Sequence, residues 1–163
     1  MAVIFRYKNG RIIPIKVDEE QTTNDYMNDK IRNKGKETFD NIEANSPEEY
    51  KQKRKEYVNK NIKFKQTDYP ADYYKINAMI DNKIAGVVRY SIEDGQIYVD
   101  FIDTEDNYLR SGVATNLYKQ LQSKTPNKDI VFGDLTPEGK ALLNKIGTIK
   151  KNKNGKYYGR IKM

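Results

Sequence analysis

One short segment of this sequence combines residue types that suit the binding of an anion. Residues 109–114 read Leu-Arg-Ser-Gly-Val-Ala and lead into a segment whose apolar residues recur every four positions, as in a helix. The first turn of a helix leaves several backbone N–H groups without acceptors, and the helix dipole favours negative charge there. Gly112 would let a ligand approach the backbone closely, and Ala114 adds little bulk. We predict a phosphate or pyrophosphate site here; a plain strand-to-helix turn is the alternative interpretation.

The elements that must position this turn are visible on both sides of it. Short runs rich in β-branched and aromatic residues indicate strands, and two longer patterns with an apolar face indicate helices. The predicted order is strand, strand, strand, helix, strand, helix, strand and strand, over residues 73–80, 83–92, 96–102, 112–123, 129–135, 137–146, 148–151 and 156–162. Gly147 is expected to end the second helix. The fold class is α/β (α+β), with a mixed, mostly antiparallel sheet flanked by helices and strand 96–102 at its centre.

The N-terminal part of the chain has a different sequence pattern. Two β-rich runs, Ala2–Tyr7 and Arg11–Val17, flank the dipeptide Asn9-Gly10, which favours a hairpin turn. Residues 18–45 are polar and rich in turn-forming residues. We expect an N-terminal β-hairpin extension followed by a segment that is mobile or depends on a partner.

A helix is predicted to follow this polar segment. Ser46 can cap it, Pro47 suits its first turn, and the pattern continues to about Asn61. We therefore divide the chain into an N-terminal hairpin with its polar segment, residues 1–45, and one domain over residues 46–163.

The composition excludes several classes of chemistry. The chain contains no cysteine and no histidine, so disulfides, thiolate metal sites and imidazole bases are all ruled out. No carboxylate spacing matches a calcium-binding loop. No apolar run approaches the roughly 18 residues of a membrane span, and no signal-peptide core is visible. We expect a soluble, cytoplasmic protein without a metal and without a membrane partner.

The charge of the chain is unevenly distributed. The net charge is +7, and residues 150–163 contain six basic residues and no acidic one. Such a basic tail could bind nucleic acid, form a solvated hairpin, or help to hold an anionic cofactor. The composition alone leaves these three interpretations open.

Residues 72–163 resemble the GNAT superfamily of acetyl-CoA-dependent acyltransferases. In that family the pyrophosphate loop reads Gln/Arg-x-x-Gly-x-Gly/Ala between the fourth strand and the third helix, and residues 109–114 match it at the glycine and the alanine. Residues 84–86, Ile-Ala-Gly, resemble the family's third strand after its hairpin turn. Residues 142–147, Leu-Leu-Asn-Lys-Ile-Gly, resemble its fourth helix, which ends in Lys-x-Gly. Leu109 departs from the usual Gln or Arg, which a loop that binds through its backbone tolerates.

This resemblance implies a site for acetyl-CoA, or another acyl-CoA, along the fourth strand and the turn after it. The strand at 96–103 would splay from its neighbour and bind the pantetheine arm through its backbone. The residues implied to contact the cofactor are Ile102, Asp103, Leu109, Arg110, Ser111, Gly112, Val113, Ala114 and Thr115.

The resemblance also implies direct attack of a substrate amine on the thioester, assisted by a general base on or beside the same strand. Counting in twos places Tyr98, Asp100 and Ile102 on one face of this strand, and residues 99, 101 and 103 on the other. By this count Asp100 is the candidate base and Tyr98 a positioning group. A solvated or salt-bridged carboxylate is the competing interpretation of Asp100.

One departure from the family concerns the proton returned to the leaving thiolate. Many members carry a tyrosine on the fourth helix, four residues before the glycine, whereas Leu143 occupies that position here. Tyr157, Tyr158 or water would have to donate the proton instead, or the domain would not catalyse acylation.

A second, shorter resemblance concerns the N-terminus. Residues 5–15, Phe-Arg-Tyr-Lys-Asn-Gly-Arg-Ile-Ile-Pro-Ile, look like a segment found in bacteriophage structural or mobile-element proteins. It implies a phage-encoded protein.

Three functions remain open from the sequence. The first is acyl-CoA-dependent N-acyltransfer to an amine of a protein or small molecule. The second is a GNAT-like binding module without catalysis, for example one acting on a host protein. The third is a basic nucleic-acid-associated protein that uses residues 51–65 and 150–162. Nothing in the sequence identifies the acyl acceptor.

Overall fold

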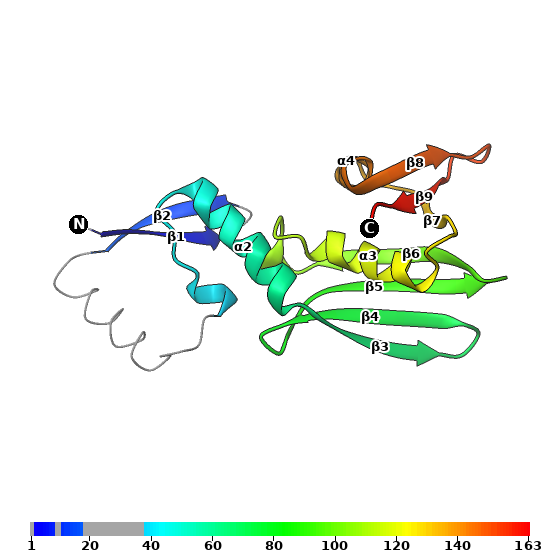
Figure 1. Ribbon diagram of the computed structural model, residues 1–163, viewed down its shortest axis with the longest axis horizontal. Coiled ribbons are helices and arrows are strands. Elements are labelled where there is room, and N and C mark those ends of the chain that lie inside the picture. Colours follow the sequence, from blue (N-terminus) through cyan, green and yellow to red (C-terminus); the bar gives the residue numbers. More distant parts are fainter. Residues whose placement is uncertain (1, 9–10, 18–37) are drawn as a thin grey trace. The chain divides into compact units, whose positions relative to one another are not determined.

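The computed structural model of this chain describes residues 2–8, 11–17 and 38–163, and it divides the chain into two compact units, residues 1–61 and 62–163. Figure 1 shows the elements of both units. The hairpin turn at Asn9-Gly10 and residues 18–37 of the predicted polar segment 18–45 lie outside the described residues, so the predictions made for them stay predictions.

The first unit begins with the predicted hairpin. Strands β1 (Ala2–Lys8) and β2 (Arg11–Val17) pair antiparallel, with Lys8 opposite Arg11 and Ala2 opposite Val17. A 3-10 turn, η1 (Phe39–Asn41), lies within the polar segment predicted over residues 18–45, and Phe39, Ile42 and Ala44 of this part are buried.

Helix α2 (Pro47–Asn61) begins where the sequence predicts it. The Ser46 hydroxyl accepts the N–H of Glu49 at 3.1 Å, and the Glu49 carboxylate accepts the N–H of Asn45 at 3.0 Å, so two N–H groups at the helix start are satisfied. Arg54 is buried, with its guanidinium 4.8 Å from the centre of the Phe39 ring. The contact joins α2 to η1 by a cation–π interaction.

The second unit is a seven-stranded sheet with the order β3-β4-β5-β6-β7-β9-β8. Its strands are β3 (Lys63–Tyr69), β4 (Tyr73–Ile80), β5 (Lys83–Glu93), β6 (Gln96–Thr104), β7 (Ile130–Gly133), β8 (Gly147–Lys151) and β9 (Tyr157–Ile161). Its helical elements are η2 (Asp106–Tyr108), α3 (Val113–Lys124) and α4 (Pro137–Ile146). The predicted order of elements and the central place of β6 are confirmed: every neighbouring pair is antiparallel except β6 and β7.

Strand β3 is the one element of this sheet that the sequence did not predict. Its residues, Lys-Phe-Lys-Gln-Thr-Asp-Tyr, are mostly exposed, because it lies at the edge of the sheet. An edge strand with polar side chains on both faces lacks the alternation by which strands are recognised.

Helix α3 covers one face of the meander. Val113, Leu117 and Leu121 are at most 1% exposed, which confirms the predicted apolar stripe. A Cβ added to Gly86 on β5 would lie 2.8 Å from Val113 Cγ1, so the helix and the strand are in close contact there. In Figure 1 α3 lies across β5 and β6. The start of α3 is thereby fixed beside the end of β6.

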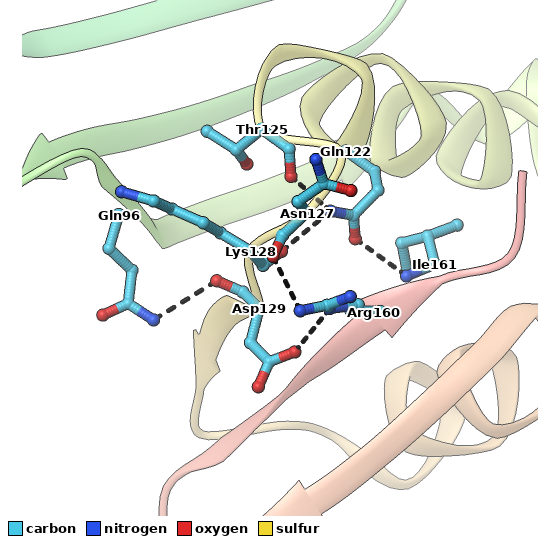
Figure 2. Close-up of polar contacts among 8 residues, drawn as sticks. All are labelled: Gln96, Gln122, Thr125, Asn127, Lys128, Asp129, Arg160 and Ile161. Atoms are coloured by element: carbon cyan, nitrogen blue, oxygen red, sulfur yellow. Dashed lines mark hydrogen bonds and ion pairs between the residues drawn. The ribbon is translucent and has the colours of Figure 1, made fainter.

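The C-terminal end of α3 is held by the buried side chain of Gln122. Its amide nitrogen donates to the carbonyls of Thr125 and Lys128 at 2.8 and 2.9 Å, and its oxygen accepts the N–H of Ile161 at 2.9 Å. Figure 2 shows these contacts. Arg160 adds a hydrogen bond to Asp129 at 2.9 Å, so the loop after α3 is tied to β9.

Gly147 ends α4 as predicted, because it is the C-cap of the helix and its N–H donates to the carbonyl of Leu143. Its φ of −160° is extended rather than left-handed, and it starts β8 directly. Glycine is required because a Cβ would overlap the carbonyl oxygen of Arg160 on the paired strand β9. The close approach of two strands, and not a left-handed cap conformation, therefore explains the glycine.

Candidate functional site

The turn between β6 and α3 has an ordered backbone. The Ser111 side chain is fully buried and its hydroxyl donates to the carbonyl of Tyr108. Arg110 and Gly112 adopt left-handed backbone conformations, with φ of 58° and 94°. Gly112 is the N-cap of α3, and its carbonyl accepts from the backbone and side-chain nitrogens of Asn116 at 3.0 and 2.8 Å. The predicted position of Gly112, at a helix N-terminus, is confirmed.

The first turn of α3 leaves its positive end open. Within this fully described helix no side chain caps the N-terminus, and no acidic residue lies in the first turn. The N–H groups of Val113, Ala114 and Thr115 therefore lack the side-chain acceptor found at most helix starts. The Val113 side chain is buried, so this residue can reach a ligand only through its backbone. Leu109 is half-buried and Arg110 is exposed.

Strand β6 contains a bulge that changes the predicted faces. Val99 is opposite Tyr90 and Phe101 is opposite Arg89, so Asp100 has no partner in the register. A bulge of one residue interrupts the alternation of faces. Tyr98 therefore lies on the face of Phe101 and Asp103, opposite to Ile102, and the period-two count is wrong beyond residue 99.

Strands β6 and β7 are joined at a single position. The register pairs only Tyr98 with Val131, whereas on its other side β6 pairs with β5 as far as Thr104. Within this described sheet, the β7-facing edge of residues 100–104 thus has no strand partner. That edge includes Ile102, which is half-buried, and Asp103, which is exposed. An extended ligand could use the unpaired backbone groups of this edge.

The two candidate catalytic residues, Tyr98 and Asp100, are close in sequence, but no hydrogen bond joins their side chains. The Tyr98 hydroxyl donates to the side-chain oxygen of Gln96 at 3.2 Å. Asp100 is exposed at the bulge, two residues after Tyr98, the position that joins β6 to β7. The acid expected on the fourth helix is replaced by Leu143, which is fully buried in the core.

The two tyrosines of the last hairpin lie on opposite faces of β9. Tyr158 is opposite Val131 and lines a shallow pocket of about 260 Å³ with Asp129, Lys150 and Arg160. The ring of Tyr157 lies between the amines of Lys140 and Lys151, at 5.5 and 5.6 Å. Because Val131 is also the partner of Tyr98, Tyr158 lies in the same row of the sheet as Tyr98, whereas Tyr157 is opposite Gly133, beyond the position that joins β6 to β7.

The described residues contain no group of three or more carboxylate, histidine or cysteine side chains that could hold a metal ion. None of the helices in the described part of the chain is long and apolar enough to span a bilayer.

Comparison with known proteins assigns the family. A family model described as the acetyltransferase (GNAT) family matches residues 36–134, more than half of the chain. The chain belongs to the GNAT acetyltransferase family. A comparison with curated proteins found no match. The range matched to the GNAT model includes α2, the bulged strand β6, the turn at Gly112 and helix α3.

The residues of this GNAT chain fit the acyl-CoA cofactor that the family generally uses. An uncapped helix start without acidic residues suits a pyrophosphate. The unpaired edge of β6 suits the amides of a pantetheine arm. The bulge at Asp100 and the bridge at Val131 have no signal in the sequence, because a register shift depends on the partner strand and not on the bulged residues alone.

Proposed function

We propose that this chain transfers an acetyl group from acetyl-CoA to an amine of a small molecule or a protein. The observation that supports the proposal most is the conjunction of two features at one end of β6. One is the open N-terminus of α3 at Gly112, and the other is the unpaired edge of the strand beyond Tyr98. The family match supports the same class of chemistry over this range.

In this proposal, backbone groups bind the acyl-CoA. The N–H groups of Val113, Ala114 and Thr115 bind the pyrophosphate, and Gly112 admits it because no side chain stands in the way. The edge of β6 at Ile102 and Asp103 binds the amides of the pantetheine. Acyl-CoA supplies an acyl group activated as a thioester, which an amine can attack directly.

Two polar side chains are assigned to the chemistry. Asp100 takes the proton of the attacking amine, since its carboxylate is exposed at the bulge. Tyr158 returns a proton to the departing sulfur, because Leu143 cannot do so and Tyr158, unlike Tyr157, lies in the same row of the sheet as Tyr98. Tyr98 positions the acceptor beside them.

Binding and turnover can be measured separately. Isothermal titration with acetyl-CoA, CoA and pantetheine should give tight binding of the first two only, since pantetheine lacks the pyrophosphate. The free thiol of CoA released from acetyl-CoA in the presence of amines can be followed with a thiol reagent. The protein contributes no background to this assay because it contains no cysteine.

Gly112→Glu should abolish CoA binding by bulk and by like charge. Gly155→Glu is the matched control, because Gly155 has a similar left-handed backbone (φ 79° against 94°) but lies in the β8–β9 hairpin. Equal loss in both variants would indicate backbone strain and not a ligand contact. Failure of the parent protein to bind CoA would refute the proposal. Tight CoA binding without turnover of any amine would favour a non-catalytic binding module, for which the buried Leu143 is the supporting observation.

A further inference from the structure

The strand register divides the side chains of β3–β6 between two faces of the sheet. The face that includes Gly86 and Val88 packs on α3 and is buried. On the opposite face two rows run across all four strands. One row joins Tyr69, Tyr73, Ser91 and Tyr98, and the next joins Thr67, Lys75, Arg89 and Phe101. We call this side of β3–β6 the aromatic face.

The aromatic face exposes large apolar side chains that folding would ordinarily bury. Tyr69, Tyr73, Phe101 and Ile84 are 44%, 52%, 46% and 48% exposed. They are four of the six large apolar side chains exposed in the described part of the chain, and the register places all four on this face. Concentration of exposed apolar groups on one face marks an interaction surface.

The charges around these rings favour an anionic occupant. Lys63, Lys65, Lys75 and Arg89 lie on the same face, against the two carboxylates of Glu93 and Asp103. None of the four basic side chains forms an ion pair with a described residue, and the Lys75 amine lies 6.0 Å from the centre of the Tyr69 ring. A second copy of the chain would bring like charges together here, which disfavours self-association through this face.

The combination of flat exposed rings and unpaired cations matches the chemistry of unpaired nucleotides. Same-face residues are about 7 Å apart along a strand and about 5 Å apart between strands, so several rings can be contacted by successive bases. A duplex hides the faces of its bases and could not use the rings. An acidic polypeptide could use the cations but gains little from three aromatic rings in two adjacent rows.

We propose that the aromatic face binds single-stranded nucleic acid, with bases stacked on Tyr69, Tyr73 and Phe101 and phosphates contacted by Lys65, Lys75 and Arg89. The chain's net charge of +7 supports attraction of such a strand over a distance. The aromatic face adjoins the proposed acyltransferase site at Tyr98, which ends its first row, but the proposed stacking residues have no role at that site and the binding does not require catalysis.

Fluorescence anisotropy with labelled oligothymidine and oligouridine of about 15 nucleotides tests the proposal, with a duplex of equal length alongside. The full chain should bind both single strands at low salt and bind the duplex more weakly. Tyr73→Ala should lower the affinity about tenfold, as expected for loss of one stacked base, whereas Tyr73→Phe should retain it. Tyr157→Ala is the control, because that ring lies between Lys140 and Lys151 and not on the aromatic face.

Several outcomes would overturn this assignment. Equal affinity of the parent and Tyr73→Ala would place any binding on the basic tail. Preference for the duplex, or absence of binding at low salt, would reject a stacking surface. Tighter binding of polyglutamate than of either oligonucleotide, with the same dependence on Tyr73, would assign the face to an acidic polypeptide. Circular dichroism of each variant checks that the fold is retained. Retention is expected for Tyr73→Ala because the Tyr73 side chain is exposed.

Discussion

The side-chain oxygen of Gln122 accepts the backbone N–H of Ile161 at 2.9 Å, so the helix that begins at the proposed cofactor turn is bonded to the last strand of the chain. The same amide also satisfies two carbonyls in the loop after the helix. A buried amide with all these partners provides a fixed connection between α3 and the sheet.

Replacing Gln122 by leucine should destabilise the second unit by about 3 kcal/mol, since one buried N–H and two part-buried carbonyls would lose their partner. Urea unfolding followed by circular dichroism measures the change in the free energy of unfolding. Gln120→Leu, two residues earlier on the same helix and half-buried, is the control and should cost far less. Equal stability of parent and Gln122→Leu would show that the network contributes nothing.

The glycines of the last two strands should not tolerate a methyl group. A Cβ at Gly159 would overlap the carbonyl oxygen of Thr148, as one at Gly147 would overlap that of Arg160. We expect Gly147→Ala and Gly159→Ala each to cost at least about 2 kcal/mol, because backbone must move in both cases. Gly139→Ala, where the nearest atom is a side-chain oxygen at 3.2 Å in a helix, should be almost neutral. A thermal melt that ranks Gly139→Ala as the most damaging would contradict this account.

The buried phenol of Tyr118 predicts a loss of stability at alkaline pH. Burial raises its pKa from 10.0 to about 12, where its ring packs edge-on against Phe132. The neutral form is favoured in the folded state, so this contribution is complete below pH 10 and is lost as pH rises towards 12. The free energy of unfolding should fall by up to about 1.4 kcal/mol per pH unit in that window from this group.

Tyr118→Phe should show a shallower fall over the same pH range, as measured by urea unfolding at successive pH values. The parent and the variant share every lysine, so the difference between their slopes isolates the phenol. If the free energy of unfolding falls equally steeply with pH in both proteins, Tyr118 has the same pKa in the folded and unfolded chains.

Much of the fold could be predicted because its signals are local. Gly112 before an apolar stripe indicates a helix start, and Ser46-Pro47 indicates another; the structure has both. What could not be predicted depends on partners distant in sequence. The bulge at Asp100 is defined by its register against β5, and the extended Gly147 by a carbonyl on β9.

The same distinction between local and distant signals applies to the candidate site. The turn at residues 109–114 was predicted from its own residues, whereas the faces of β6 were not, because one unpaired residue reverses the alternation. Strand β3 could not be predicted for another reason. Its sequence is mostly polar and lacks the apolar alternation of a half-buried strand, so only its pairing with β4 identifies it.

The assignment of Asp100 as the general base predicts a specific kinetic change. Asp100→Asn keeps the size of the side chain but removes its basicity, so turnover should fall by about 10²- to 10⁴-fold while CoA affinity stays nearly constant. Asp103→Asn, another exposed carboxylate of β6, should retain turnover because only its backbone is assigned a role. Since the chain has no histidine, the pH–rate profile should follow a carboxylate or the substrate amine. An unchanged rate in Asp100→Asn would leave water as the base.

The assignment of Tyr158 as proton donor can be tested against its neighbour. Both residues are tyrosines of β9, but Tyr158 is opposite Val131, in the same row as Tyr98, whereas Tyr157 contacts Lys140 and Lys151 on the other face. Tyr158→Phe removes one hydroxyl, so thiol release should slow by about 10²-fold or more with unchanged CoA affinity. Tyr157→Phe should remain close to the parent. Because the departing thiolate needs less help as its own pKa falls, an acyl donor with a more acidic thiol should restore much of the rate to Tyr158→Phe. If both variants turn over like the parent, water returns the proton. No other side chain then replaces the tyrosine that many family members have at the position of Leu143.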